Sequence, residues 1–96
     1  MSMWTTSRYA HKETRETARQ WARLLDRPYV ARGKHTIMQL AAFARRKGEN
    51  RICVVEEKNN RPAVLSVITV NETGEWERAA TWEIQYESED PVERAV

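Results

Sequence analysis

The stretch that most constrains the fold is residues 29–48, where a short apolar segment leads through a basic glycine turn into an amphipathic helix. Thr36 followed three residues later by Gln39 is the pattern of a capping box, so the helix is predicted to begin at Ile37 and to end before Gly48. Apolar residues recur along it at helical spacing, which commits one face to a core. They are Ile37, Leu40, Ala41 and Ala44, flanked by Met38 and Phe43.

The turn before this helix, Arg32-Gly33-Lys34, is predicted to lie at the rim of the domain, because the helix is anchored by its apolar face. Gly33 can adopt a positive φ and allow close approach of a ligand to the backbone. Arg32 and Lys34 place two cations beside the unpaired N–H groups of a helix N-terminus, which suits a phosphate. The same residues also occur as an ordinary solvated turn, and the local pattern alone leaves both interpretations open.

The remaining periodicities predict one α/β domain over residues 1–87, with an acidic tail over residues 88–96 that shows no period. The predicted order is βαβαβββ in a single mixed sheet with two helices. Strands are expected over 3–6, 29–31, 51–56, 63–70 and 76–86, and helices over 13–25 and from 37 to Gly48. The run from Arg51 to Glu56 is apolar on both alternating sets, which is typical of a strand in the middle of a sheet.

Right-handed crossovers place the ends of successive parallel strands at the same edge of a sheet. The first such end carries Thr6-Ser7-Arg8 and the second carries Arg32-Gly33-Lys34. The order of elements therefore predicts that two basic turns, separated by about twenty-five residues, meet in space.

Two further elements carry a distinctive pattern. In the first helix one face is predicted to pack, and three arginines recur at every fourth residue on another strip, which is either a binding surface or a solvated face. The packing set is Ala18, Trp21, Ala22 and Leu25, and the arginines are Arg15, Arg19 and Arg23. In the last strand one alternating set is expected to be buried and the other, largely glutamate, to be wet. The set expected to be buried is Trp76, Ala80, Trp82, Ile84 and Tyr86.

Charge is distributed unevenly along the chain. Residues 1–51 hold twelve Lys/Arg and four Asp/Glu, a net of +8, whereas residues 52–96 hold four Lys/Arg and ten Asp/Glu, a net of −6. Such asymmetry favours a polyanionic partner. The alternative is that the two halves face each other across the fold. Arginine outnumbers lysine in the basic half, which favours bidentate phosphate contacts.

Several function classes are disfavoured. The single Cys53 cannot form an internal disulfide and is expected to be a small buried hydrophobe, which predicts a reducing, cytoplasmic setting. No metal site and no cofactor are expected, since no Cys/His cluster has zinc-ligand spacing. We expect no membrane association, because neither a spanning apolar run nor the layout of a signal peptide is present. His11 and His35 show no carboxylate or thiol partner in the sequence, so catalysis is not expected.

At its two basic turns the sequence resembles the N-terminal half of the Brix domain, a module of ribosome-biogenesis proteins. Met-Trp-Thr-Thr-Ser-Arg at residues 3–8 is similar to that family's opening strand and Thr-Ser-Arg turn, and Thr14-Arg15 to the start of its first helix. The later matches are Tyr29 to Lys34 with Leu40-Ala41 in the following helix, Ile52 to Glu56, and Asn60 to Ala63. The resemblance covers about residues 3–70.

The resemblance implies a fold related to anticodon-binding domains, no catalysis, and a role in assembling a ribosomal subunit by binding ribosomal RNA or its precursor. The RNA-binding residues that it implies are Thr6, Ser7, Arg8, Arg15, Arg32, Gly33 and Lys34. A full Brix domain has two similar halves, and this chain matches one, so we expect two copies to pair as a homodimer. The alternative is a protein-interaction module that docks onto a ribosome-assembly protein through its edge strand.

Overall fold

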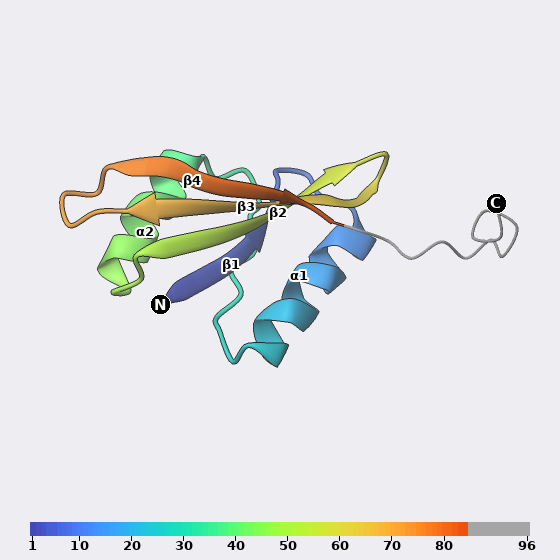
Figure 1. Cartoon of the computed structure of the whole chain (residues 1–96), viewed down its shortest axis with the longest axis horizontal. Coiled ribbons are helices and arrows are strands. Elements are labelled where there is room, and N and C mark those ends of the chain that lie inside the picture. Colours follow the sequence, from blue (N-terminus) through green and yellow to red (C-terminus); the bar gives the residue numbers. More distant parts are fainter. Residues whose placement is uncertain (85–96) are drawn as a thin grey trace, which may run out of the picture.

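The structure, a computed structural model, describes residues 1–84, which form a four-stranded sheet in the order β1-β2-β3-β4 and two helices (Figure 1). β1 is parallel to β2, and the other neighbours are antiparallel. The predicted α/β class with a mixed sheet and two helices is therefore confirmed. The elements are β1 (Ser2–Thr6), α1 (Lys12–Leu24), α2 (Ile37–Arg46), β2 (Arg51–Lys58), β3 (Arg61–Val70) and β4 (Trp76–Glu83).

The helices cover opposite faces of the sheet, as Figure 1 shows. β2 contributes to both cores, because its consecutive residues 52–55 are all buried. Its central position was predicted from the apolar character of both alternating sets, and this is confirmed. The core under α2 contains Met3, Leu40, Ala41, Ala44, Ile52, Val54, Ile68 and Val70. The core under α1 contains Trp4, Ala18, Ala22, Cys53 and Val55.

The strand predicted over residues 29–31 is reduced to one bridge, between Tyr29 and Trp4 in parallel orientation. Two backbone bonds accompany it, from Trp4 N–H to Pro28 O at 2.9 Å and from Val30 N–H to Trp4 O at 2.8 Å. Two arginine side chains extend this ladder along β1. Arg27 Nε donates to Ser2 O at 2.8 Å, and Arg32 Nη1 donates to Thr6 O at 2.8 Å.

The outer carbonyl groups of β1 are thus satisfied by guanidinium groups where a regular strand would supply backbone N–H groups. The prediction of a full strand was wrong, because the backbone hydrogen bonds to β1 come only from the segment Pro28 to Val30. Proline has no N–H, so it is favoured at such an edge. The segment still runs beside β1, which preserves the predicted neighbourhood of the two basic turns.

α2 has the predicted capping box: Thr36 Oγ1 accepts from Gln39 N–H at 3.1 Å, and Gln39 Oε1 accepts from Thr36 N–H at 2.9 Å. Ile37 is its first residue, and Gly48 follows its end with a φ of 75°. Met38 does not join the apolar stripe and is 71% exposed. Its position two residues before Leu40 directs it away from the buried face.

α1 begins one residue earlier than predicted and ends at Leu24. Ala18 and Ala22 are buried as expected, but Leu25 is 59% exposed, so its assignment to the packing face was wrong. Leu25 lies outside the helix, and Asp26 has a φ of 55°, which turns the chain away before the helical period brings Leu25 onto the sheet.

β4 departs from the predicted alternation because its pairing with β3 shifts by one residue. Val67 pairs with Ala80 and Ile68 with Arg78, so Ala79 is an extra residue. A bulge reverses the faces, which places Trp82 on the α1 side and Trp76 on the α2 side. Both are exposed, at 54% and 41%, so the prediction of one buried set was wrong. The expected position of Tyr86 and the expected tail 88–96 lie outside the described residues.

Candidate functional site

The two basic turns meet at the carboxyl end of β1, as the order of elements predicted. We define the first turn as residues 6–8 and the second turn as residues 32–34. Arg32 joins them, because its Nη1 donates to Thr6 O at 2.8 Å while its Nε donates to His35 O at 2.7 Å. Ser7 N–H donates to Val55 O at 3.0 Å, which fixes the first turn to β2.

Arg32 is only 8% exposed. Burial lowers the pKa of its guanidinium, and the neighbouring Arg8 lowers it further, while Glu56 acts in the opposite sense. With two of its donor groups bonded to backbone carbonyls, Arg32 holds the two turns together. A phosphate at this edge would therefore be contacted first by the exposed cations around Arg32.

A cleft of about 230 Å³ lies on the α1 side of Arg32, and we call it the α1-side cleft. The two turns meet the first half of α1 there, and both Arg15 and Arg19 are exposed along it. The Cζ atom of Arg19 lies 5.2 Å from the centroid of the Tyr29 ring, a cation–π contact. The lining residues are Thr6, Ser7, Tyr9, Ala10, Arg15, Arg19, Tyr29, Ala31, Arg32 and Gly33.

A second cleft, of about 200 Å³, lies on the other side of Arg32, and we call it the α2-side cleft. Three arginines, Arg8, Arg32 and Arg78, line this cleft together with one carboxylate, that of Glu56. Arg78 Nη1 is 3.7 Å from Glu56 Oε2, and the same oxygen accepts a hydrogen bond from Ser66 Oγ. Its lining residues are Ser7, Arg8, Arg32, Ile37, Val54, Glu56, Ile68 and Arg78. The excess of cations over carboxylates makes this cleft a favourable place for an anion.

The structure therefore brings most of the predicted site residues to one edge. Thr6, Ser7, Arg15, Arg32 and Gly33 line the α1-side cleft, and Arg8 lies in the α2-side cleft. Gly33 has a φ of 54° with open space where a Cβ would be, as the approach of a ligand requires.

Two predicted residues differ from that arrangement. Lys34 is exposed beside Gly33 and lines neither cleft. The Thr6 side chain is 2% exposed, and its Oγ1 donates to Ser7 O at 3.0 Å, so it faces the protein.

Three residues of these clefts were missed by reasoning from the sequence. Arg19 was noticed only as part of a helix strip, although its spacing of four from Arg15 places the two on one face. Tyr29 was assigned to a strand without a binding role. Arg78 is a single base among the glutamates of β4, and only the pairing of β4 with β3 places it near Arg8.

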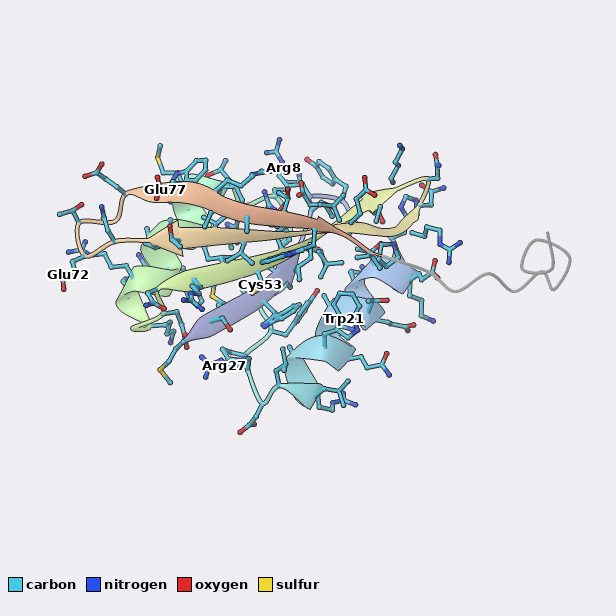
Figure 2. The ribbon with its side chains drawn as sticks, viewed as in Figure 1. Arg8, Trp21, Arg27, Cys53, Glu72 and Glu77 are labelled. Atoms are coloured by element: carbon cyan, nitrogen blue, oxygen red, sulfur yellow. The ribbon has the colours of Figure 1, made fainter. Side chains whose placement is uncertain are left out.

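The acidic residues of the β3–β4 turn lie at the other end of the sheet. Register places Ser2, Arg51, Thr69 and Glu77 in one row, whereas Thr6 is in a row with Val55, Leu65 and Trp82. Figure 2 shows Glu72 and Glu77 towards the β3–β4 turn, away from Arg8. These carboxylates therefore do not cover the clefts.

One carboxylate near the first turn has a structural partner. Glu57 Oε2 accepts from His11 N–H at 3.0 Å and from Thr14 Oγ1 at 2.7 Å, and its Oε1 is 2.9 Å from His11 Nδ1. Burial would raise the pKa of Glu57, but the hydrogen bonds from Thr14 and His11 outweigh it and hold the pKa below its usual value. His11 thus has a carboxylate partner, from 46 positions away, that the sequence did not reveal. The carboxylate caps the start of α1.

The other side chains considered for chemistry are placed as follows. Cys53 is 8% exposed, and burial raises the pKa of its thiol, as befits a core residue. Within residues 1–84, no group of three or more His, Cys, Asp and Glu side chains is arranged to hold a metal ion. The helices in that part of the chain are too short or too polar to cross a membrane.

No protein-family model and no curated protein matches the chain. Solved structures do. An archaeal Imp4-like protein superposes with a TM-score of 0.64 and 27% identity over 77% of this chain and 46% of its own. A probable ribosomal biogenesis protein from Aeropyrum pernix K1 superposes with a TM-score of 0.78 and 22% identity over 88% of this chain and 48% of its own.

The chain thus spans about half the length of the solved proteins that it matches. Imp4 is a Brix-domain protein, so the resemblance to half of a Brix domain, first drawn from the two basic turns, is confirmed.

Proposed function

We propose, from this similarity to half of a Brix domain, that the chain is a non-catalytic ribosome-biogenesis factor that binds ribosomal RNA or its precursor in the cytoplasm. The observation that carries the proposal is the meeting of the two basic turns at one edge of the sheet, joined by Arg32. Exposed cations border both sides of this contact, and phosphate contacts from such cations supply most of the affinity of proteins for nucleic acids. The name of one of the two solved structures, a probable ribosomal biogenesis protein, agrees with a role in ribosome assembly.

The RNA-binding surface in this proposal consists of the two turns and the adjoining face of α1. Arg8 and Lys34 are the exposed cations of the two turns, and neither forms an ion pair with a residue among 1–84. Gly33 lets the backbone N–H groups near the start of α2 approach a phosphate. Arg32 and Thr6 contribute by holding the two turns in place.

Replacing Arg8 and Lys34 together by alanine tests this surface. We expect weaker binding to a labelled RNA stem-loop with a single-stranded tail, and a slope of log K against log salt that is smaller by about two, since each lost phosphate contact removes about one. Fluorescence anisotropy over a salt series measures both quantities. Arg45→Ala is the matched control, because Arg45 lies against Gly74 at the opposite end of the sheet. An unchanged slope in the double variant would contradict the proposal.

A second function, a protein-interaction module, is favoured by the surface of β4. This strand is at the edge of the sheet and carries two exposed tryptophans, Trp76 at 41% and Trp82 at 54%. Exposed aromatics on an edge strand suit either pairing with a second copy of the chain or docking of a ribosome-assembly protein.

Light scattering at micromolar concentration tests the homodimeric form of this second function. Pairing through β4 predicts a dimer mass that falls to the monomer mass in Trp82→Ser, because burial of the indole is lost. Met38→Ser, which changes an apolar residue 71% exposed on α2, should leave the mass unchanged. A monomer at every concentration would rule out the homodimer.

A further inference from the structure

The α1-side cleft contains two hydroxyl groups without a partner. Ser7 Oγ and Tyr29 Oη are both buried, and neither makes a hydrogen bond within residues 1–84. A buried polar atom left unpaired costs free energy, so such atoms in folded proteins call for an explanation. Both residues line the same cleft, so a ligand that enters it lies beside them, and a bond from it requires each hydroxyl to turn towards the cleft.

The mouth of the cleft indicates the charge of that ligand. Arg15 and Arg19 are one helical turn apart on α1, both are exposed, and neither forms an ion pair in the described part of the chain. Like charges at this spacing repel each other, and an anion between them removes the repulsion. Arg19 also packs on the Tyr29 ring, which holds the phenol in place beside the cleft.

Tyr9 supplies an apolar surface beside these polar groups. It lines the same cleft, is 70% exposed, and has a φ of 59°, which is uncommon for a residue with a side chain. An exposed aromatic ring next to paired arginines is the combination on which proteins stack unpaired bases while binding the adjoining phosphate.

The size of the cleft decides how much of a ligand it takes. Its volume of about 230 Å³ is below the ~300–1,000 Å³ of sites that enclose a whole small molecule. It therefore suits one unit of a chain that continues outside. A base held in a duplex is stacked on its neighbours and presents no free face to Tyr9, which favours a single strand.

We infer that the α1-side cleft binds one unpaired nucleotide of single-stranded RNA. Arg15 and Arg19 neutralise its phosphate, the hydroxyls of Ser7 and Tyr29 bond to its phosphate or ribose oxygens, and its base stacks on Tyr9. This inference rests on the proposed RNA-binding function and adds the form of RNA that the site recognises.

Tyr29→Phe is the sharpest test, because it retains the ring under Arg19 and removes only the hydroxyl. We expect its affinity for a labelled single-stranded oligouridylate to fall about tenfold, the effect of losing one hydrogen bond to a charged group. Ser7→Ala should behave in the same way, and Tyr9→Ala should lose a similar factor through stacking. Arg45→Ala is again the control, since Arg45 lies against Gly74 at the opposite end of the sheet.

Stability of the free variants supplies an independent measurement. A buried hydroxyl without a partner costs free energy, so Tyr29→Phe and Ser7→Ala should keep or raise the melting temperature of the unchanged protein. A marked fall in the melting temperature of Tyr29→Phe would overturn the inference, because the hydroxyl would then serve the fold.

Binding data separate this inference from the function on which it rests. If the protein binds no RNA at all, both fail. If binding depends on Arg8 and Lys34 but Tyr29→Phe is unchanged, only the present inference fails. Equal or tighter binding to a duplex of the same length would also overturn it, since the site would then read the backbone of paired RNA.

Discussion

Arg32→Ala is expected to lower the free energy of unfolding by about 2–4 kcal/mol, the range for losing charge-assisted hydrogen bonds in a buried site. The substitution leaves the carbonyl groups of Thr6 and His35 without their donors. It also removes the only side chain that spans the two turns in the described part of the chain. Urea unfolding followed by circular dichroism measures the loss.

Arg32→Lys separates charge from geometry. A lysine retains the positive charge but has no planar fork, so it cannot reproduce the pair of bonds that Arg32 makes in two directions. We expect it to recover less than half of the loss. Arg8→Ala is the control, because Arg8 is an exposed arginine of the α2-side cleft that donates to no described group, and its change should fall within about 0.5 kcal/mol. Full recovery by lysine would show that charge alone is required.

Arg27→Ala is expected to cost about 2–3 kcal/mol by a related mechanism at the other end of β1. Arg27 Nη2 is 2.8 Å from both carboxylate oxygens of Glu49, while its Nε donates to Ser2 O. The Glu49 side chain is 10% exposed, so removing its partner leaves a poorly solvated charge.

A double variant identifies the origin of this cost. Arg27→Ala combined with Glu49→Gln removes the stranded charge, and its thermal unfolding should therefore be closer to that of the unchanged protein than Arg27→Ala alone. If the double variant is the less stable of the two, the bond to Ser2 O and packing would account for the effect. Lys12→Ala, which breaks an exposed pair with Glu16, should change stability by less than about 0.5 kcal/mol.

Much of the fold could be predicted because its signals are local. The capping box of α2 involves Thr36 and Gln39 alone, and the buried run of β2 is visible as consecutive apolar residues. The meeting of the two turns followed from the handedness of parallel connections, which holds whether the second segment is a full strand or a single bridge. The position of Arg15 and Arg19 on one face of α1 also follows from their spacing of four residues.

The parts that could not be predicted depend on distant partners. Nothing near Arg32 indicates that it donates to Thr6 O, and nothing near His11 indicates Glu57. The bulge at Ala79 is visible only in the register between β3 and β4, yet it decides which face each tryptophan occupies. The net charge of the basic half also overstated the charge available to a ligand, because two of its arginines, Arg27 and Arg32, donate to backbone carbonyl groups.

The occupied outer side of β1 has a consequence for assembly. The Trp4 backbone groups are bonded to Pro28 O and Val30 N–H, and the Ser2 and Thr6 carbonyl groups accept from the Arg27 and Arg32 side chains. Among the strands of residues 1–84, β4 is therefore the edge that is available to a further strand. A subunit with one edge available for strand pairing forms a closed dimer, whereas growth of a fibre requires two such edges. Any self-association through strand pairing should accordingly stop at two subunits.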